Sequence, residues 1–260
     1  MFSRRLFIGV ARDFWYSFIY RKKFKEYLEK IEATPPQKVI YTTISNNYDC
    51  LNLHVYLNPD YRYVCFTDNR RYLRRKMVGP WEIRPLPFAK LDVGRNSRYP
   101  KLHPHELFPE YDESIYVDAN IVFKSNLLFE AAEALSLQKD VFLAIPPHRR
   151  RNCIYDELAE CLIYKKDREE VLLRHKAFLE QENYPRHWGL TENNVIYRKH
   201  HHPMCVKIMS EWWRMLEHYS RRDQLSLFYV LWKNNQQMTY LLDKAIKADK
   251  LNFRLYHHNK

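Results

Sequence analysis

The chain has 260 residues, of which 46% are hydrophobic and 15% aromatic, so it can bury the core of one large domain and is not a disordered chain. Lys and Arg number 43 against 31 for Asp and Glu, and the resulting charge of +12 favours an anionic partner: a phosphorylated substrate, a phospholipid surface or nucleic acid. Only four glycines are present, which excludes the glycine-rich phosphate loops of the common nucleotide-binding folds.

Residues 1–34 are predicted to form a basic amphipathic helix that precedes a domain at 35–260. Phe, Trp, Tyr and Ile are interleaved here with Arg and Lys, which is typical of a helix lying in a membrane interface. Arg12 and Asp13 make the apolar stretch too short and too charged to span a bilayer, and no signal-peptide cleavage site is recognised. The alternative is a helix packed on the domain's own core. We expect a cytoplasmic protein, with this arm either packed or peripheral to the inner face of a membrane.

Strands and helices alternate in the first half of the domain, after a Pro-containing break at 33–37. Strands are predicted at 38–45, 61–69, 81–88, 114–121 and 140–148, and a helix at 126–138. This alternation predicts an α/β fold with a mostly parallel, twisted sheet flanked by helices. Ligands of such sheets bind beyond the carboxyl ends of the strands.

Polar residues follow four of these strands, at 46–49, 67–68, 118–120 and 148–149. Each group alone is ordinary turn chemistry, but together they indicate a ligand site on one rim of the sheet. Asp118 and Asn120 are expected to point the same way, because strand side chains alternate between faces. A buried carboxylate is costly unless it is paired or bound to a metal. We therefore predict a divalent cation, Mg²⁺ or Mn²⁺, that neutralises the diphosphate of a nucleotide-sugar donor.

The second half of the chain is more helical. Residues 156–181 are predicted to form one long helix or a helix pair. Helices are also predicted at 203–219 and 223–233, with a short strand at 194–200, and the Met and Trp stripes of these last two helices are interpreted as core. The five cysteines are scattered without a Cys-x-x-Cys pair, so reduced thiols are expected and a zinc site is not. Cys153 and Cys161 are interpreted as small hydrophobic residues of a helix.

A series of short motifs, taken in order, carries a resemblance to a known family: FTDN (66–69), RNSRYPKLHPHELFP (95–109), SIYVDANI (114–121), WGLTENNVIYRKHHHP (188–203), RRDQLSLFYVLWK (221–233) and YHHNK (256–260). From about residue 38 to its end, the chain resembles the glycosyltransferase-like family named after the plant TOD and MUCI proteins. The resemblance implies a GT-A glycosyltransferase fold, a nucleotide-sugar donor and a glycan or lipid-linked acceptor, as in surface polysaccharide synthesis.

The resemblance also implies which residues bind the donor. Asn47 and Asp68 are expected to face the nucleoside. Arg98 and Lys101 are expected to contact the diphosphate, for which arginine offers bidentate hydrogen bonds. The cation, and through it the donor, is expected to be held by a set of four candidates: Asp118, Asn120, His257 and His258. Asn120 stands where a second carboxylate is usual, so the metal requirement is an open question.

A looser similarity to retaining family-eight transferases implies the remaining roles. Asp223 and Gln224 are expected to position the donor sugar, and Glu192 and Asn193 to lie near the sugar or the acceptor. Retention of anomeric configuration is favoured by this analogy alone. For an inverting reaction, Asp223 is the expected general base.

The same residues have simpler interpretations. Asp223 fits a helix-capping pattern with Ser220, and Arg98 and Lys101 fit a solvated helix face. The histidines at 200–202 fit a surface turn, and those at 257–258 a frayed chain end. The basic run at 148–151 suits an anionic acceptor or a lipid headgroup. Nucleic acid is not the expected partner, because no recognition motif or aromatic stacking platform is present.

A second function from another class competes with the enzyme. On this view the chain is a basic, non-catalytic module that binds anionic polysaccharide or membrane on a degenerate transferase fold. Asn120 favours it, because a neutral amide binds a cation less strongly than a carboxylate.

The arm at the N-terminus yields a testable prediction. We expect the full chain to float with vesicles that contain anionic lipid, and a chain lacking the first 30 residues to stay behind, because the basic and aromatic side chains are then removed. Flotation assays on both chains measure this. Equal flotation of the two would contradict a membrane role for the arm.

Overall fold

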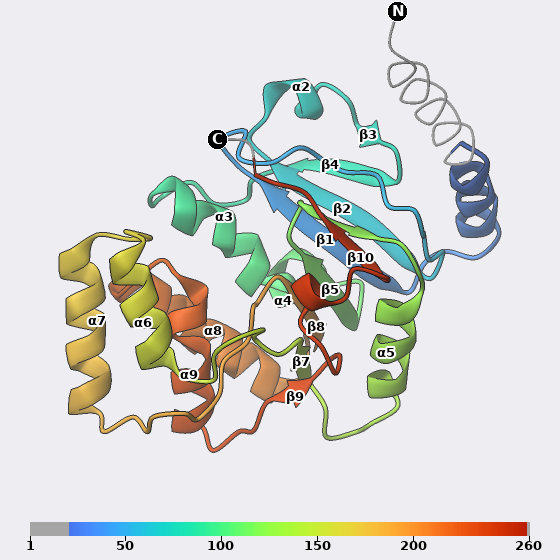
Figure 1. The fold of residues 1–260 in the computed structure, drawn as a ribbon. Helices are drawn as coiled ribbons and strands as arrows, with labels where there is room; N and C mark the ends of the chain where they lie inside the picture. The colour runs from blue at the N-terminus through green and yellow to red at the C-terminus, as the bar shows by residue number, and fades with distance from the viewer. Residues whose placement is uncertain (1–20, 259–260) are drawn as a thin grey trace, which may run out of the picture.

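The fold is that of a computed structural model, which describes residues 21–258 (Figure 1). Residues 1–20 of the predicted N-terminal arm therefore lie outside the described residues. Residues 21–33 are helical and pack on the domain: the buried Tyr27 hydroxyl donates to the Tyr61 carbonyl at 3.1 Å, and its ring contacts Tyr63 edge-on at 5.6 Å. Within the described residues, no helix combines the length and apolar character needed to cross a membrane.

An eight-stranded sheet forms the centre of the molecule, in the order β3-β4-β2-β1-β5-β8-β7-β9. The strands β4, β2, β1 and β5 run parallel, β8 lies antiparallel between β5 and β7, and β9 is parallel to β7. Their bounds are β1 Lys38–Ile44, β2 Tyr61–Thr67, β3 Met77–Val78, β4 Trp81–Pro85, β5 Glu113–Val117, β7 Leu143–Ile145, β8 Val195–Lys199 and β9 Thr239–Tyr240. The predicted mostly parallel α/β sheet is confirmed.

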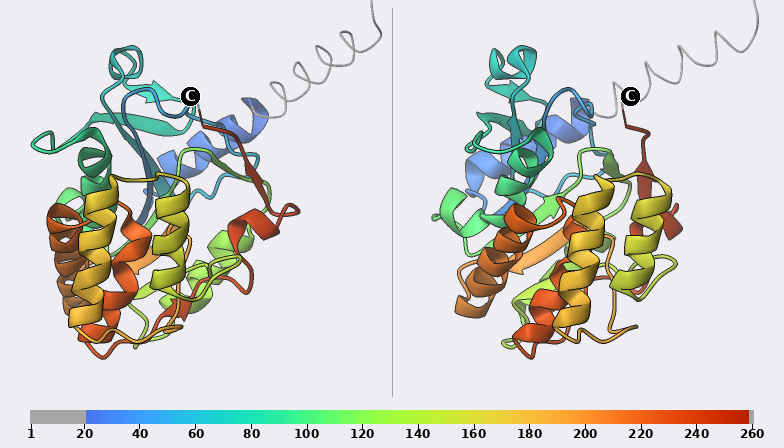
Figure 2. Two further views of the ribbon diagram at one scale, coloured as in Figure 1. Left: turned by 60° about the vertical axis from the view of Figure 1, so that its left-hand side comes forward. Right: turned by 90° about the vertical axis from the view of Figure 1, so that its left-hand side faces the viewer.

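Helices cover both faces of the sheet (Figures 1 and 2). Alternate residues of β1 supply the two cores: Val39 and Tyr41 pack toward one set of helices, while Ile40 and Ile44 pack toward the helix at 21–33 and α5. The helices are α2 Arg70–Leu73, α3 Val93–Leu102, α4 Pro104–Leu107, α5 Leu127–Ser136, α6 Ile154–Ile163, α7 Glu169–Gln181, α8 Pro203–His218 and α9 Leu227–Lys233, with short 3₁₀ turns η1 Asp223–Leu225 and η2 Ile246–Ala248.

The predicted strand at 114–121 is interrupted. β5 ends at Val117, and a turn in which the Ile121 amide donates to the Asp118 carbonyl at 3.0 Å leads into β6, Ile121–Phe123. β6 pairs antiparallel with β10, Phe253–Leu255, outside the main sheet. Asp118 and Asn120 thus occupy a turn between two strands, and the expectation of a shared strand face was wrong.

Gly189, in the segment between α7 and β8, permits a close approach to α9. Its φ of +126° is accessible to glycine, and a β-carbon there would lie 2.1 Å from Cε1 of Phe228. We expect Gly189→Ala to lower the free energy of unfolding by about 2–5 kcal/mol through backbone strain and overpacking. Denaturant unfolding measures this. Gly94→Ala is the control, since its nearest neighbour at 3.0 Å is the flexible Arg221 side chain; equal losses in both variants would contradict the interpretation.

Candidate active site

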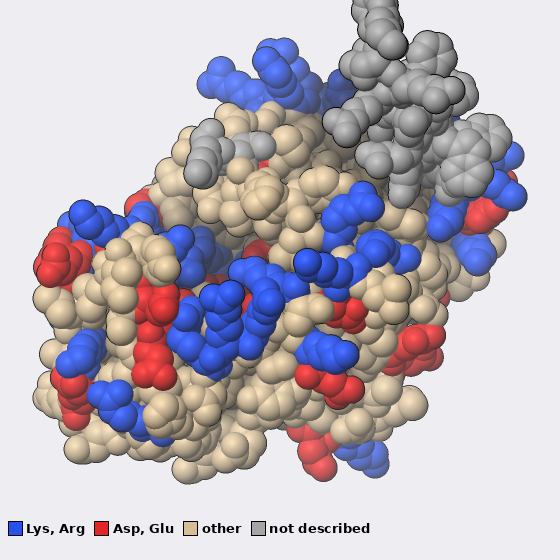
Figure 3. Space-filling view, in the orientation of Figure 1, with Lys and Arg blue, Asp and Glu red and all other residues tan. Residues whose placement is uncertain are grey.

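A cleft of about 690 Å³ opens beyond the carboxyl ends of β1 and β5. Its walls come from those strand ends, α3, the segment before β8, the start of η1 and the final residues of the described chain. Seven Lys or Arg and five Asp or Glu side chains line it. Lys and Arg gather across the middle of the face shown in Figure 3. A second hollow, of about 520 Å³, lies at the amino ends of β1 and β2, away from these charges.

A buried ion pair stands at the back of the cleft. Lys101, in the last turn of α3, places its Nζ 2.5 Å from Oδ2 of Asp223, and the two side chains are 5% and 6% exposed. The same ammonium lies 4.0 Å from Oδ1 of Asp118 and 4.8 Å from the centre of the Tyr116 ring. The Lys101 ammonium therefore lies near two carboxylates, one from the turn after β5 and one from η1.

Asp223 is held ionised by this arrangement. Burial by itself raises the pKa of its carboxyl, but Lys101 and then Arg98 outweigh burial and lower it below the usual range. The backbone carbonyl of Asp223 accepts a hydrogen bond from the Trp212 indole at 3.0 Å, which fixes η1 against α8. The carboxylate is bound to Lys101 and does not cap η1, whose preceding residue is Arg222. The alternative prediction that Asp223 caps a helix was therefore wrong.

Arg198, in β8, fixes the backbone of Lys101. This fully buried guanidinium donates to the Lys101 carbonyl and to the Tyr41 hydroxyl, both at 2.5 Å. Its bond to Lys101 ties β8 to the end of α3 by a charge-assisted contact. The backbone position from which the Lys101 side chain extends is therefore fixed.

Arg98 lies one turn earlier on α3 and also lines the cleft. One terminal nitrogen donates to the Gly94 carbonyl at 3.0 Å and to the Ser97 hydroxyl at 3.1 Å. Its Nε is buried and has no partner among residues 21–258. Both of these hydrogen bonds of Arg98 thus stay within α3, whereas Lys101, predicted to bind diphosphate with it, is already paired with Asp223.

Asp118 begins the turn after β5. Its amide donates to the Asn194 carbonyl at 2.8 Å, and its Oδ1 accepts the Tyr116 hydroxyl at 3.0 Å. Its side chain is 35% exposed in the cleft. Asn120, two residues on, donates its side-chain amide to the Tyr256 carbonyl at 3.0 Å and so fastens the C-terminal strand to this turn.

The predicted cation ligands fit only in part. Asp118, Asn120 and His258 line the cleft, and His257 does not. His258 is 2.8 Å from Asp49 through Nδ1, and Asp118 and the two histidines do not meet as a three-ligand cluster within the described range. Asp118 alone suits Mg²⁺ or Mn²⁺, which often take one or two carboxylates and complete their shell with water and phosphate. Lys101 already supplies positive charge beside it.

The segment before β8 forms the opposite wall. Burial raises the pKa of the Glu192 carboxyl, which accepts from the Asn194 side chain at 2.9 Å. Gln224 donates to the Thr191 carbonyl at 3.1 Å and so joins η1 to this segment. Asn193 is buried behind the wall in a left-handed conformation, with φ of +57°, and is not part of the lining.

Asn47 and Asp68 lie at the rim, where they connect the loops after β1 and β2. Asp68 accepts the Asn46 amide at 2.9 Å, and Asn47 accepts the Asn69 side chain at 2.6 Å. Neither belongs to the cleft lining, whereas Asn46, Tyr48 and Asp49 do. Asn47 thus lies between side chains that line the cleft, whereas no residue of the loop after β2 belongs to the lining.

Several residues that line the cleft were not predicted from the sequence. Tyr116 reads as an ordinary strand residue, and nothing local marks Lys247 in η2 or Glu157 in α6 as neighbours of β5. The pair Arg221 and Arg222, directly before Asp223, was the available signal. Their charge beside a polar motif pointed to an anion site.

Comparison with known proteins places the chain. It belongs to the family described as TOD1/MUCI70, glycosyltransferase-like domain, which matches residues 40–257. The predicted resemblance is confirmed. Among solved structures it is similar to the WbbM bifunctional glycosyltransferase in its apo form, with 14% identity, a TM-score of 0.46, and coverage of 80% of this chain and 39% of that one. It is also similar to mouse xyloside xylosyltransferase 1, with 11% identity, a TM-score of 0.46, and coverage of 79% and 85%. No curated protein matches it.

The Lys101 ion pair leads to a stability prediction. Lys101→Met should lower the free energy of unfolding at pH 7 by about 3–5 kcal/mol, because Asp223 keeps a buried charge without its nearest partner. Lys176→Met, in the exposed pair with Glu180 on α7, should cost only about 0.3–0.5 kcal/mol.

The pH dependence has a definite sign. A lowered carboxyl pKa stabilises the wild type above the unfolded pKa of about 3.9, and this stabilisation is lost as the pH falls through the folded pKa. In Lys101→Met the Asp223 pKa should rise, so the gap between variant and wild type should narrow from pH 7 to pH 5. Denaturant unfolding across this range, with Lys101→Met/Asp223→Asn as a rescue, measures it. A gap that does not change with pH would contradict the pairing.

Proposed function

We propose that the chain is a glycosyltransferase that moves a sugar from a nucleoside diphosphate sugar to an acceptor hydroxyl in its charged cleft. The observation that carries the proposal is the pair of carboxylates, Asp118 and Asp223, held by Lys101 beyond the carboxyl ends of β1 and β5. Membership of a glycosyltransferase-like family supports it. The strand ends of such a sheet are where a nucleotide-derived ligand binds.

In this proposal Arg98 is the principal protein contact of the diphosphate. Its side chain lines the cleft, and two oxygens of a phosphate suit a guanidinium. Asp118 would hold a Mg²⁺ or Mn²⁺ ion, which would supply Lewis-acid chemistry for the leaving diphosphate. The loop residues Asn46 and Tyr48, with Asn47 and Asp68 behind them, face the nucleoside.

Two further acids of the cleft, Asp223 and Glu192, have different chemical tasks. The bond from the anomeric carbon to the diphosphate oxygen breaks, a bond to the acceptor oxygen forms, and the acceptor hydroxyl gives up a proton. Asp223, paired and with a lowered pKa, is a weak base and suits stabilisation of the positive charge that develops on the sugar. Glu192, whose pKa burial raises, is the better base for the acceptor proton in an inverting reaction. In a retaining reaction the leaving diphosphate takes that proton.

The acceptor is a glycan or a lipid-linked saccharide that enters past the segment before β8. The arginines at 149 and 150 are exposed at that side, after β7, and suit an acceptor with anionic groups.

A non-catalytic binding module is the second candidate. Asn120 supports it, since its side chain is engaged with Tyr256 and supplies no carboxylate to the cleft. The two functions differ in turnover, because both bind nucleotide sugar or polyanion but only the enzyme releases nucleoside diphosphate.

A nucleotide-sugar screen tests the proposal. Purified full chain is incubated with a panel of donors and Mn²⁺ or Mg²⁺, with and without saccharide acceptors, and free nucleoside diphosphate is measured. We expect one donor to be hydrolysed slowly and transferred faster with acceptor, and Asp223→Asn to abolish both. Donor binding without release under all conditions would favour the binding module.

The same preparation tests the diphosphate contact. Arg98→Ala should weaken nucleoside diphosphate binding by about 1.5–3 kcal/mol, roughly 10- to 150-fold, and leave nucleoside binding unchanged, because charged hydrogen bonds are lost to the phosphates alone. Arg75→Ala, which removes an exposed arginine outside the cleft, is the matched control. Calorimetric titration gives both affinities. Equal weakening for nucleoside and diphosphate in Arg98→Ala would refute the assignment.

A further inference from the structure

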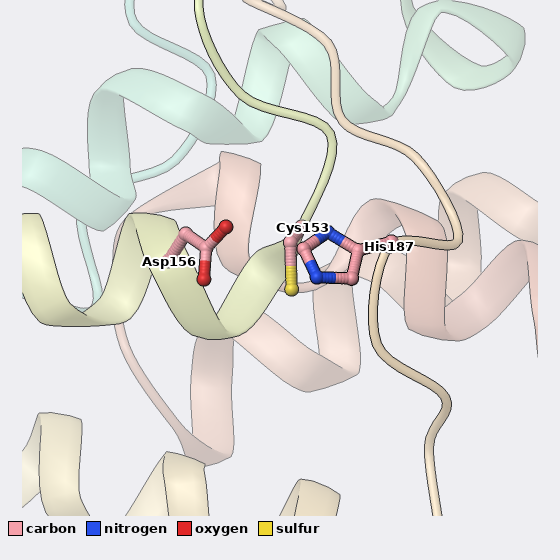
Figure 4. Close-up of side chains that lie close together, drawn as sticks. All are labelled: Cys153, Asp156 and His187. Carbon is pink, nitrogen blue, oxygen red and sulfur yellow. The ribbon is translucent and has the colours of Figure 1, made fainter.

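Away from the cleft lining, three side chains with metal-binding atoms meet at the start of α6. Cys153 directly precedes the helix, Asp156 lies in its first turn, and His187 comes from the segment between α7 and β8. A sulfur, a carboxylate oxygen and an imidazole nitrogen from these residues all lie within 4.8 Å of one another (Figure 4). They form the one such cluster of three among residues 21–258.

The imidazole of His187 is oriented as a metal ligand would be. Its Nδ1 lies 3.1 Å from the side-chain oxygen of Asn152, which only accepts hydrogen bonds, so Nδ1 carries the proton and Nε2 keeps its lone pair. A histidine ligand commonly donates its other ring N–H to a carbonyl or carboxylate in this way. In Figure 4 a ring nitrogen of His187 lies on the side of the Cys153 sulfur. The Gly189 amide also donates to the Asn152 carbonyl at 2.8 Å, which ties the same two segments together.

The other two groups are not engaged elsewhere. Within the described residues, the Asp156 carboxylate makes no hydrogen bond or ion pair, although Arg151 binds the neighbouring acids Glu157 at 2.6 Å and Glu160 at 3.2 Å. The Cys153 thiol is buried and is not in a disulfide. It lies at the amino end of α6, directly before the first helical residue.

We propose that Cys153, Asp156 and His187 bind one zinc ion. Thiolate, imidazole and carboxylate together are a borderline-soft set that suits Zn²⁺, and water completes four-coordination. The two negative ligands balance the charge of the ion once the thiol releases its proton. The ion joins the segment after β7, which carries Arg151, to the segment that leads into Glu192, so it braces one wall of the cleft without entering it.

Cobalt substitution in the full chain tests the site. The protein is stripped with chelator and titrated with Co²⁺, which gives a thiolate-to-cobalt charge-transfer absorption band when sulfur is a ligand. We expect one equivalent to produce this band, Zn²⁺ to displace it, and the affinity to fall as the pH is lowered because the thiol must ionise. No band in the wild type, or a band that Zn²⁺ leaves unchanged, overturns the proposal.

Variants identify the ligands. Cys153→Ser should abolish the band, whereas Cys50→Ser, which removes the exposed cysteine, should leave it unchanged. His187→Asn should also abolish it, and the fold should persist because His187 is exposed and asparagine tolerates its φ of +56°. Asn152→Ala should weaken Co²⁺ binding about 10- to 100-fold through loss of the orienting hydrogen bond. A band that survives either ligand variant, with circular dichroism unchanged, overturns the assignment.

Discussion

The ammonium of Lys101 is the interaction on which the cleft depends. Two carboxylates, Asp118 from the turn after β5 and Asp223 from η1, approach the same point from distant parts of the chain. The two carboxylates repel each other, and the Lys101 ammonium, which is near both, offsets this repulsion. Arg198, in strand β8 of the sheet, hydrogen-bonds to the backbone carbonyl of Lys101. The Lys101 ammonium therefore keeps its position if either carboxylate moves.

The cleft shifts the carboxyl pKa values of two of its acids, Asp223 and Glu192, in opposite directions. Lysine and arginine lower the pKa of Asp223, while burial raises that of Glu192 on the opposite wall. Titratable groups whose environments separate their pKa values are typical of sites in which one acid stabilises charge and another exchanges a proton. The same wall is braced by the contacts of Asn152 with His187 and Gly189, behind the surface that faces the cleft.

The C-terminal segment completes the cleft from the far end of the chain. Asn120 holds the backbone of Tyr256, β10 pairs with β6, and His258 lies 2.8 Å from Asp49 in the loop after β1. These contacts connect the turn after β5, the loop after β1 and the C-terminal segment, which lie far apart in the sequence. Asn120 is therefore explained as a fastening of this strand, a role that a carboxylate, which has no N–H to donate, does not fill.

Much of the fold was readable from the sequence, because it rests on local patterns. Hydrophobic runs at 38–45 and 61–69 predict strands, and the alternation of strands with helices predicts a mostly parallel sheet. The motifs at 66–69, 188–203 and 221–233 predict the family. The polar groups after the strands predict the rim on which the cleft lies. Here the side-chain period and the rules of parallel sheets suffice.

Tertiary structure decided which residues act together. The predicted strand 114–121 ends at Val117, because a turn follows before β6 begins at Ile121. The mostly apolar stretches 114–117 and 121–123 on either side of this turn read as one continuous strand in the sequence. The pairing of Lys101 with Asp223, across 122 positions, and the meeting of Cys153 with His187 depend on packing between α3, α8 and the loops. The sequence determined the elements and the edge of the sheet on which the cleft lies. Which charge pairs with which is set by distance and burial, and both exist only in the folded chain.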